Sequence, residues 1–553
     1  MMSSCPPDNG LLLDTGLRIP KPTHGRAGST RFGAFCQPRM ICRFDSVWRV
    51  TPCFWWCVCG GGEVSPQRVY VLRPLALRAY AAPPSRLAAR GALGLGVAPR
   101  AHQNGARVWP QGIARAGRRI VSLACEGNDS RAPENARRAS DTWYTAPVWR
   151  FTFYGRFHVL TGMETLWKNR DWMNRLRHSR TGVLSHAASI SPSGEHLVFA
   201  LRREGVATTR LFAPEHGLWG AAQDMEGVEH QFDEIVQSEV TSLYGHDVDS
   251  LKPREAMLSG LDAVVIDVQD VGARYYTFAY TALFLAQAAL ERGIDVYVID
   301  RPNPVNGTTL EGNLIDKGFE SFVGVRSGMT RHGMTLCELI RMWCVQDGTP
   351  NLESLHLCWM EGYDRRSYFD ETGVLWTMPS PNMPTLETAV VYPGMCLLEG
   401  TNLSEGRGTT RPFEIFGAPW VDANAAHRGV EALCLPGVVF RPVDFKPMFQ
   451  KHAGQVCHGL QMYVTDRRRF RSVLTGIAVL SVMSALHAEF SWRSETYEFV
   501  RDILAIDLLF GNDTVRKQIE GQENPYRIVE GFDAQTESWR GLRREFLYYG
   551  DGE

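Results

Sequence analysis

Charged side chains follow two predicted strands of this sequence at the points where the strands end. Asp267 and Asp270 come at the end of an apolar run over residues 263–268, and Asp300 and Arg301 directly follow a second apolar run. Carboxyl groups can exchange protons with a substrate, and arginine binds anions through paired hydrogen bonds. Any one of these carboxylates could equally be a turn former, but the cluster as a whole indicates a functional site.

These charged residues depend on a strand, a helix and a second strand for their position. Residues 263–268 and 296–299 are short, apolar and rich in Val and Ile, as strands buried on both faces are. Between them, residues 275–292 carry apolar side chains at helical spacing, and Gly293 suits the position after a helix end. A connection of this length makes the two strands parallel neighbours in one sheet. Ligands of open α/β sheets bind at the carboxyl edge, where the charged residues are expected.

A further acidic residue, Glu215, follows a predicted strand over residues 209–212 and is flanked by His216 and Gly217. It is therefore expected at the same edge of the sheet. A glutamate shielded from water there could serve as a catalytic acid, because desolvation raises the pKa of a carboxyl group. The competing interpretation is the charged first turn of a helix.

A glycine-rich segment over residues 399–414 has the composition of a ligand-binding loop. Its glycines allow close backbone approach, and Arg407 and Arg411 could each bind a carboxylate through two hydrogen bonds. The segment lacks the Gly-Lys-Ser/Thr ending of a phosphate loop. The alternative is a linker, because residues 377–420 are rich in Pro, Gly, Thr and Asn and are predicted to be irregular.

The motifs predict neither a cofactor nor a metal ion. No G-x-G-x-x-G motif follows a predicted strand, which argues against a dinucleotide. The histidines that could join the acidic residues, His216, His230, His246 and His332, lack the H-x-H or H-x-x-x-H spacing of metal ligands. A metal-dependent hydrolase is therefore the lesser alternative.

The overall composition is that of a globular protein, but its first part differs from the rest. The 553 residues are 44% hydrophobic and 22% charged with a formal net charge of −1, so neither nucleic acid nor a membrane is indicated as a partner. Residues 1–162, however, hold 22 Lys and Arg against 8 Asp and Glu. They show no helical or strand period, and their one compact apolar run is too short to span a membrane.

We interpret the chain as a leader followed by two domains. The leader, residues 1–162, is predicted to be disordered or not part of the native protein. Residues 163–390 are predicted to form a Rossmann-like α/β domain, and residues 391–553 a smaller α+β domain, with the active-site cleft between the two. A chain that starts at Met163 carries no export signal and is expected in the cytoplasm, whereas export is the alternative for the longer chain.

Several motifs, taken in order, resemble the exo-β-N-acetylmuramidase family. They are PEHG at residues 214–217, DVQDVGARYYT at 267–277, DRPNPVNG at 300–307, RHGMT at 331–335, PSPNMPT at 379–385 and EGTNLSEGRGTTRPFE at 399–414. The resemblance extends from about residue 165 to the end of the chain. The sequence departs from the family at Val305-Asn306, where a glycine-rich pair is more usual, and in its leader.

The resemblance implies a glycoside hydrolase that releases terminal N-acetylmuramic acid from the non-reducing end of peptidoglycan fragments during cell-wall turnover. It implies the two-domain fold described above, with Glu215 as the principal catalytic carboxylate. Glycoside hydrolysis usually needs two carboxyl groups, and the candidates for the second are Asp267, Asp270, Glu311 and Glu405. Whether the reaction retains or inverts the configuration stays open, and a non-catalytic muropeptide-binding protein on the same scaffold is the alternative.

All predicted site residues are expected to face one common hollow. The lactyl carboxylate of N-acetylmuramic acid needs cations, which Arg274, Arg407 and Arg411 could provide. The predicted catalytic residues are Glu215, His216, Asp267 and Asp270. The predicted substrate-binding residues are Arg274, Tyr275, Asp300, Arg301, Asn303, Glu311, His332, Glu399, Asn402, Glu405, Arg407 and Arg411.

Overall fold

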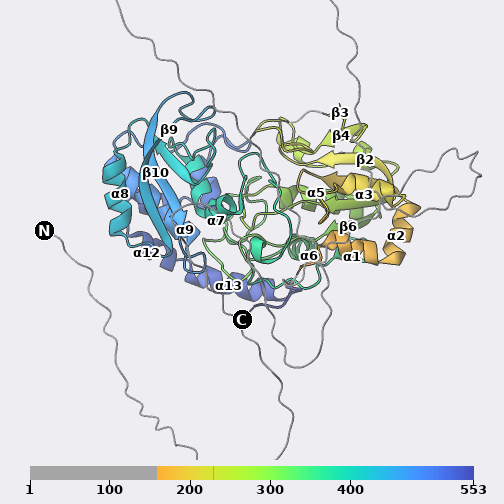
Figure 1. Ribbon diagram of the computed structural model, residues 1–553. Helices are drawn as coiled ribbons and strands as arrows, with labels where there is room; N and C mark the ends of the chain where they lie inside the picture. Colours follow the sequence, from red (N-terminus) through yellow and green to blue (C-terminus); the bar gives the residue numbers. More distant parts are fainter. Residues whose placement is uncertain (1–157, 224, 228–229, 553) are drawn as a thin grey trace, which may run out of the picture. The chain divides into compact units, whose positions relative to one another are not determined.

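A mostly parallel sheet organises the first half of the folded chain (Figure 1). The computed structural model describes residues 158–552, except 224, 228 and 229, so the predicted leader up to residue 157 lies outside the described residues. The seven strands of the sheet are β1 (Arg180–Ser185), β2 (Ala207–Ala213), β3 (Gln231–Asp233), β4 (Ser238–Ser242), β5 (Ala263–Asp267), β6 (Asp295–Ile299) and β7 (Leu355–Cys358).

The strands lie in the order β3-β4-β2-β1-β5-β6-β7. Only β3 runs antiparallel to its neighbour among these seven strands. The segments over residues 263–268 and 296–299 are β5 and β6, which pair in parallel as predicted. Strands β2 and β5 are both parallel to β1, so they end at the same edge of the sheet. The residues that follow β2 and β5 therefore share that edge.

Helices cover both faces of this sheet, because the apolar side chains of its central strands point alternately to one face and to the other. Val264 and Ile266 of β5 join the core that contains α5 (Phe278–Leu290) and α6 (Leu336–Gln346). Ala263 and Val265 point the other way and join the core of α1 (Gly162–Lys168), α2 (Arg170–Arg177) and α3 (Leu197–Arg203). Strands buried on both faces read as continuous apolar runs, which explains the sequence of β5.

A second, smaller sheet follows in the chain and is fully antiparallel. Its strands are β8 (Ile415–Ala418), β9 (Val438–Phe445) and β10 (Cys457–Val464), in the order β8-β10-β9. Phe416, Phe440 and Leu460 are buried in one core with side chains of α8 (Ala423–Ala432) and α9 (Ser472–Leu486). The predicted fold class, a Rossmann-like sheet followed by a smaller α+β part, is confirmed for the described residues.

The last helices return the chain to the first sheet. In Figure 1, α13 runs along the base of the molecule from α12 towards α6, and Trp539 of α13 donates a hydrogen bond to the His332 carbonyl oxygen at 2.9 Å. No helix in the described part of the chain is long and apolar enough to cross a membrane. The remaining helices are α4 (Glu255–Leu258), α7 (Leu386–Met395), α10 (Ala505–Phe510), α11 (Thr514–Glu520), α12 (Pro525–Glu530), α13 (Asp533–Arg544) and the 3₁₀ turns η1 (Val248–Leu251), η2 (Leu352–Ser354), η3 (Phe369–Glu371) and η4 (Cys396–Gly400).

The prediction that residues 377–420 are irregular is wrong in part, because α7, η4 and β8 all lie within this range. Helix α7 contains Pro393 in its last turn, which disguises it in the sequence. All residues of α7 except Glu387 are buried, so the helix shows no polar face and no amphipathic period. Pro393 has no amide hydrogen and cannot make the helical hydrogen bond to the Ala389 carbonyl oxygen, and the packing of α7 against α9 offsets that loss.

Two glycines allow α7 and α9 to cross at close range. A Cβ atom on Gly394 would lie 1.8 Å from the Ser472 carbonyl oxygen, and one on Gly476 would lie 2.2 Å from the Gly394 carbonyl oxygen. The Gly394 amide donates to Ser472 Oγ at 2.8 Å, which fixes the crossing point. This crossing holds Tyr392, on the turn before Gly394, in a defined place.

We predict that Gly394→Ala lowers the free energy of unfolding by about 1–3 kcal/mol or more, because the added methyl group forces the two helices apart. The matched control is Gly541→Ala in α13, where a Cβ atom would meet nothing within 4 Å. That variant should be more stable by about 0.5–1 kcal/mol, since alanine suits a helix interior better than glycine. Equilibrium unfolding in urea measures both values, and equal stabilities for the two variants would contradict the close crossing.

Candidate active site

Glu215 lies in a tight turn directly after β2. The turn closes with a hydrogen bond from the Gly217 amide to the Pro214 carbonyl oxygen at 3.1 Å, and His216 adopts a φ of 69°. A non-glycine residue in this left-handed region is uncommon, and such residues concentrate at functional sites. His216 Nδ1 donates to the Ala222 carbonyl oxygen at 2.9 Å, which leaves Nε2 as the acceptor nitrogen of the ring.

The carboxylate of Glu215 is fixed by donors from two other segments. Thr277 Oγ1 donates to Oε2 at 2.7 Å, and the Met225 amide donates to Oε1 at 3.2 Å. Only 5% of Glu215 is exposed. Thr277 occupies the N-cap position of α5 but its hydroxyl bonds Glu215 and not the helix backbone, so this contact ties the turn after β2 to the β5–α5 connection. A carboxylate held in this way has a defined direction towards whatever binds beside it.

Glu215 opens into a pocket of about 470 Å³, including its mouth, which we call the Glu215 pocket. Four tyrosines and a phenylalanine supply flat walls, and carboxylates and one guanidinium supply the charges. The lining consists of Glu215, His216, Tyr275, Tyr276, Thr277, Val323, Ser380, Asn382, Met383, Tyr392, Glu399, Arg407, Phe413, Tyr497 and Glu498.

Two further carboxylates, those of Glu399 and Glu498, share this pocket with Glu215. Arg407 Nη2 lies 2.8 Å from Glu399 Oε1, and the Tyr497 hydroxyl donates to Glu399 Oε2 at 2.7 Å. The Arg407 guanidinium also lies 5.2 Å from the centre of the Phe413 ring, a cation–π contact. The pocket therefore presents three acids and one arginine in fixed positions.

Of the residues predicted from the sequence, five line the Glu215 pocket, namely Glu215, His216, Tyr275, Glu399 and Arg407. The sequence reasoning missed Tyr276, Thr277, Ser380 and Asn382, although they belong to the RYYT and PSPNMPT motifs. It also missed Tyr497 and Glu498, which lie in a turn before α10. The motifs were the available signal for Tyr276, Thr277, Ser380 and Asn382. No sequence pattern marks Tyr497 and Glu498.

Asp267 and Arg301 are paired with each other, away from this pocket. Arg301 Nε lies 2.5 Å from Asp267 Oδ1, Nη2 lies 2.8 Å from Oδ2, and both residues are buried. The same guanidinium donates to the Ile190 carbonyl oxygen at 3.1 Å. Both carboxylate oxygens are thus used by one arginine. The structure gives no support to a catalytic role for Asp267, and we interpret the pair as a brace between β5 and β6.

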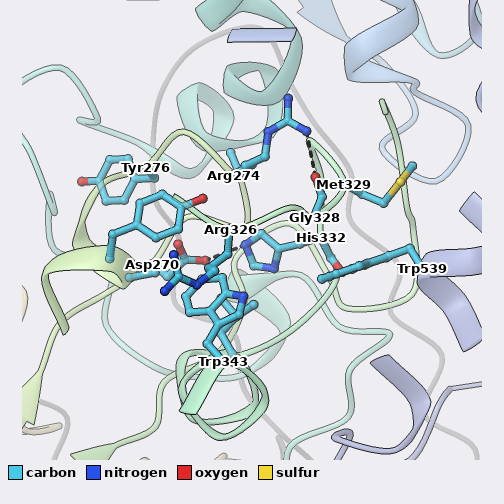
Figure 2. A pocket seen from close by; sticks show the side chains of 13 residues that line it. Asp270, Arg274, Tyr276, Arg326, Gly328, Met329, His332, Trp343 and Trp539 are labelled. Atoms are coloured by element: carbon cyan, nitrogen blue, oxygen red, sulfur yellow. Dashed lines mark hydrogen bonds and ion pairs between the residues drawn. The ribbon is translucent and has the colours of Figure 1, made fainter. Parts of the chain in front are cut away.

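Asp270, Arg274 and His332 line a different cavity, which we call the Asp270 cavity (Figure 2). His332 Nε2 lies 3.2 Å from Asp270 Oδ2, and the Gly272 amide donates to the same oxygen at 2.6 Å. Tyr276 lines both this cavity and the Glu215 pocket, so its ring forms the wall between them. Burial raises the pKa of the Tyr276 hydroxyl well above its usual value. Asp270 is therefore separated from the acids around Glu215.

The Arg274 side chain is occupied by the backbone. Its two terminal nitrogens donate to four carbonyl oxygens, those of Asn313, Gly328, Leu509 and Phe510, at 2.5–3.0 Å. The prediction that Arg274 binds the lactyl carboxylate is not supported, because these donors join the loop after β5 to the end of α10. Burial without a carboxylate partner lowers the pKa of the Arg274 guanidinium.

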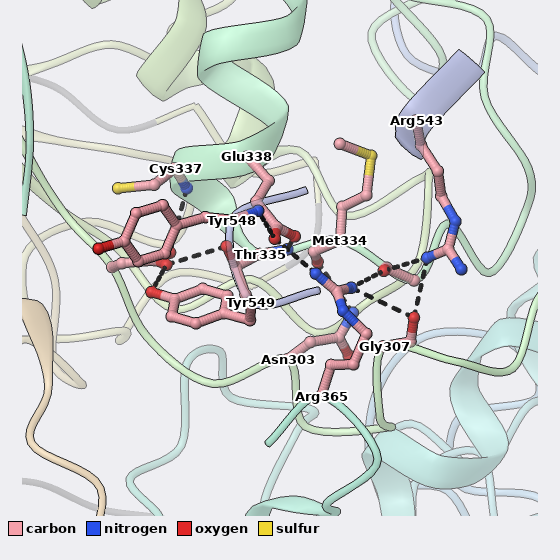
Figure 3. A network of polar contacts seen from close by, with 12 residues as sticks. Asn303, Gly307, Met334, Thr335, Cys337, Glu338, Arg365, Arg543, Tyr548 and Tyr549 are labelled. Atoms are coloured by element: carbon pink, nitrogen blue, oxygen red, sulfur yellow. Dashed lines mark hydrogen bonds and ion pairs between the residues drawn. The ribbon is translucent and has the colours of Figure 1, made fainter. Parts of the chain in front are cut away.

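Figure 3 shows a network of polar contacts that includes Thr335, Cys337 and, from the C-terminal segment, Tyr549. All three of these residues bond Asp300. Its carboxylate accepts hydrogen bonds from Tyr549 Oη at 2.6 Å, Thr335 Oγ1 at 2.9 Å and the Cys337 amide at 3.1 Å. Complete burial nevertheless raises the pKa of Asp300 to about 7. The Asn303 amide group donates to the Met334 carbonyl oxygen at 3.0 Å in the same region. Neither side chain reaches the Glu215 pocket.

The other predicted binding residues also make internal contacts outside the described lining of the Glu215 pocket. Arg331 Nη1 lies 2.9 Å from Glu311 Oε1, and Lys451 Nζ lies 3.0 Å from Glu405 Oε2. The Asn402 amide group donates to the Glu489 carbonyl oxygen at 2.8 Å. Arg411 lies 3.2 Å from Glu414 and its side chain is half exposed. These contacts brace the loops around the pocket.

Known proteins share this fold and these motifs. The family model for the N-terminal part of the exo-β-N-acetylmuramidase NamZ matches residues 181–387, and that for its C-terminal part matches residues 390–549. This chain belongs to the NamZ family. The peptidoglycan β-N-acetylmuramidase NamZ of Bacillus subtilis (strain 168) is 38% identical over 392 residues, which cover 71% of this chain and 91% of that protein.

Two crystal structures of DUF1343 family proteins from Bacteroides fragilis NCTC 9343 have the same fold. The first is 28% identical with a TM-score of 0.63, and it covers 71% of this chain and all of that chain. The second is 24% identical with a TM-score of 0.55, and it covers 71% of this chain and 99% of that chain. Among the described residues, no group of three or more His, Cys, Asp or Glu is arranged to hold a metal ion.

We predict that Asp300 makes the stability of the protein depend on pH. Its pKa of about 7 in the folded chain is above the value of about 3.9 in the unfolded chain. The favourable contribution of the protonated form is therefore complete below about pH 4 and is lost as the pH rises through about 7. Relative to Asp300→Asn, which cannot titrate, wild type should lose about 2–3 kcal/mol of unfolding free energy between pH 5 and pH 8.

Urea unfolding at both pH values measures this difference. The control is Asp249→Asn, because Asp249 is exposed and lies outside the network. A wild type whose stability relative to Asp300→Asn stays constant from pH 5 to pH 8 would contradict the burial of this carboxylate.

Proposed function

We propose that this protein hydrolyses the glycosidic bond of a terminal N-acetylmuramic acid at the non-reducing end of peptidoglycan fragments. The observation that carries the proposal is the Glu215 pocket, in which three carboxylates and Arg407 line one space together with aromatic side chains. The similar protein of Bacillus subtilis is named as a peptidoglycan β-N-acetylmuramidase, and the family is described as exo-acting.

The carboxylates of the pocket can supply both roles that glycoside hydrolysis needs. One carboxyl group protonates the glycosidic oxygen as the bond to the anomeric carbon breaks. The second either attacks that carbon, with water completing the reaction, or takes a proton from the water that attacks it. We assign Glu215 to one of these roles because the Thr277 hydroxyl and the Met225 amide fix its direction. We assign the second role to Glu399 or Glu498, in place of the four candidates taken from the sequence.

The remaining lining suits the rest of the sugar. Tyr275, Tyr276 and Tyr392 present aromatic surface, which packs against the apolar face of a pyranose ring. Arg407, which pairs with Glu399, is the arginine of this lining, and its charge can attract the lactyl carboxylate. Ser380 and Asn382 add short polar groups that can bind hydroxyl or acetamido groups.

We predict that Glu215→Gln lowers kcat for a chromogenic β-N-acetylmuraminide by about 10²–10⁴-fold, because glutamine can neither transfer a proton nor carry the charge. The matched control is Glu353→Gln, since Glu353 is an exposed glutamate outside the pocket. Steady-state kinetics on purified wild type and both variants provides the test.

Each outcome of this experiment has a distinct meaning. A wild type that binds the muraminide without hydrolysing it would support the alternative of a muropeptide-binding protein. An active wild type together with an equally active Glu215→Gln would remove Glu215 from the chemistry and leave the activity standing.

A second prediction distinguishes the roles of Arg407 and Arg411, the two arginines of the glycine-rich segment. Arg407→Gln should raise KM for the muraminide by about tenfold or more, because the carboxylate of the sugar loses its cation. Arg411→Gln should change KM by less than about twofold, because Arg411 pairs with Glu414 outside the pocket. Comparing KM at low and high salt for both variants checks that the effect is one of charge. A larger effect at Arg411 than at Arg407 would contradict the assignment.

A further inference from the structure

Two neighbouring parallel strands of the large sheet, β2 and β4, end beside the Glu215 pocket. Ala213 of β2 pairs with Ser242 of β4, and the Leu243 amide donates to the Ala213 carbonyl oxygen at 2.9 Å. Glu215 follows Ala213 by two residues, and Tyr244 follows Ser242 by the same number. The strand pairing therefore brings Tyr244 to the edge of the sheet that carries Glu215.

The hydroxyl group of Tyr244 contacts a carboxylate from a distant part of the chain. It donates a hydrogen bond to Glu498 Oε2 at 3.3 Å. The Tyr244 ring is buried, with the ring centre of Phe322 at 5.8 Å and that of Phe499 at 5.9 Å. Glu498 itself is 4% exposed and lines the pocket. Its carboxylate is thus tied to the strand next to the one that carries Glu215.

The backbone that carries Glu498 is strained. Glu498 and Phe499 are the middle residues of a two-residue turn, which the amides of Tyr497 and Val500 close by donating to each other's carbonyl oxygens at 3.1 and 2.9 Å. Both middle residues have a positive φ, 45° at Glu498 and 67° at Phe499. Turns with this backbone strongly favour Asn-Gly. Strain of this kind is retained mainly at functional sites, so the turn points to a role for Glu498 itself.

Glu399, the other candidate for the second carboxyl group, has a different task. Its Oε1 lies 2.8 Å from Arg407 Nη2, and its Oε2 accepts a hydrogen bond from the Tyr497 hydroxyl at 2.7 Å. Attack on the sugar or proton transfer by Glu399 would break an ion pair with a buried guanidinium, which is costly. The contacts of Glu399 suit a group that fixes Arg407.

We propose that Glu498 is the second catalytic carboxyl group, that Tyr244 is its positioning residue, and that Glu399 positions Arg407. The inference rests on the function proposed above and narrows its two candidates to one. Glu215 and Glu498 then divide the two roles. One gives its proton to the glycosidic oxygen, which keeps the electron pair of the breaking bond. The other, as a carboxylate, attacks the anomeric carbon or takes a proton from the water that attacks it.

Steady-state kinetics on a muramyl disaccharide, as a function of pH, tests the assignment. Glu498→Gln keeps the shape of the side chain, and it should lower kcat by about 10²–10⁴-fold and remove one limb of the pH dependence of kcat/KM. Glu399→Gln should keep both limbs and lower kcat by less than about tenfold, with its larger effect on KM. The matched control is Glu495→Gln on the same segment, where the side chain is 76% exposed, and it should behave as wild type.

Tyr244→Phe removes only the hydroxyl group and tests the positioning role. A hydrogen bond to an ionised carboxylate lowers its pKa, so the loss of this bond should move the limb that Glu498→Gln removes to higher pH. A purely structural role for Tyr244 would lower the melting temperature without moving that limb. Thermal unfolding of every variant shows that the compared proteins are folded.

The outcomes separate this inference from the function on which it rests. If wild type cleaves the disaccharide and Glu498→Gln keeps both limbs and a kcat within about tenfold of wild type, the inference is overturned and the function stands. The loss of a limb in Glu399→Gln instead would also overturn it. If folded wild type does not cleave the disaccharide, the proposed function itself fails. A lost limb in Glu498→Gln, together with a shifted limb in Tyr244→Phe, supports the inference.

Discussion

The hydrogen bond between Thr277 and Glu215 is the contact on which the rest of the site depends. It joins the turn after β2 to the first residue before α5, although β1 lies between β2 and β5 in the sheet. The direction of the Glu215 carboxylate is therefore set by the register of three parallel strands. The brace of Asp267 and Arg301 at the end of β5 keeps that register, because a buried pair with both oxygens bound tolerates little displacement.

The part of the Glu215 pocket that includes Glu399 and Arg407 is supported by contacts of its own. Lys451 Nζ donates to the carbonyl oxygens of Leu398 and Leu403 and to Glu405 Oε2, at 2.9–3.1 Å. Although burial opposes it, the charges of Lys451 and Arg407 hold the pKa of Glu405 below its usual value. One ammonium group thus fixes the loop that places Glu399 and Arg407 in the lining of the Glu215 pocket. The predicted binding residues that lie outside the pocket, such as Glu405, therefore hold its loops in position.

The sequence predicted the fold and the position of Glu215 after a strand, because both depend on local patterns. An apolar run followed by a polar turn predicts a strand end, and β5, β6 and the position of Glu215 all follow from that pattern. The same pattern placed Asp267, Asp270 and Asp300 at the sheet edge but could not reveal their partners. Asp300, for example, meets Tyr549 from the far end of the chain. Such pairings depend on tertiary packing, as do the buried helix α7 and the turn that carries Glu498.

The central claim is that the terminal sugar binds in the pocket shared by Glu215, Glu399 and Arg407. A crystal structure of the Glu215→Gln variant with an uncleaved muramyl disaccharide tests it most directly. The account predicts the glycosidic oxygen within hydrogen-bonding distance of residue 215 and the lactyl carboxylate beside Arg407. A sugar found instead in the Asp270 cavity, or one bound with its glycosidic oxygen remote from residue 215, would contradict it.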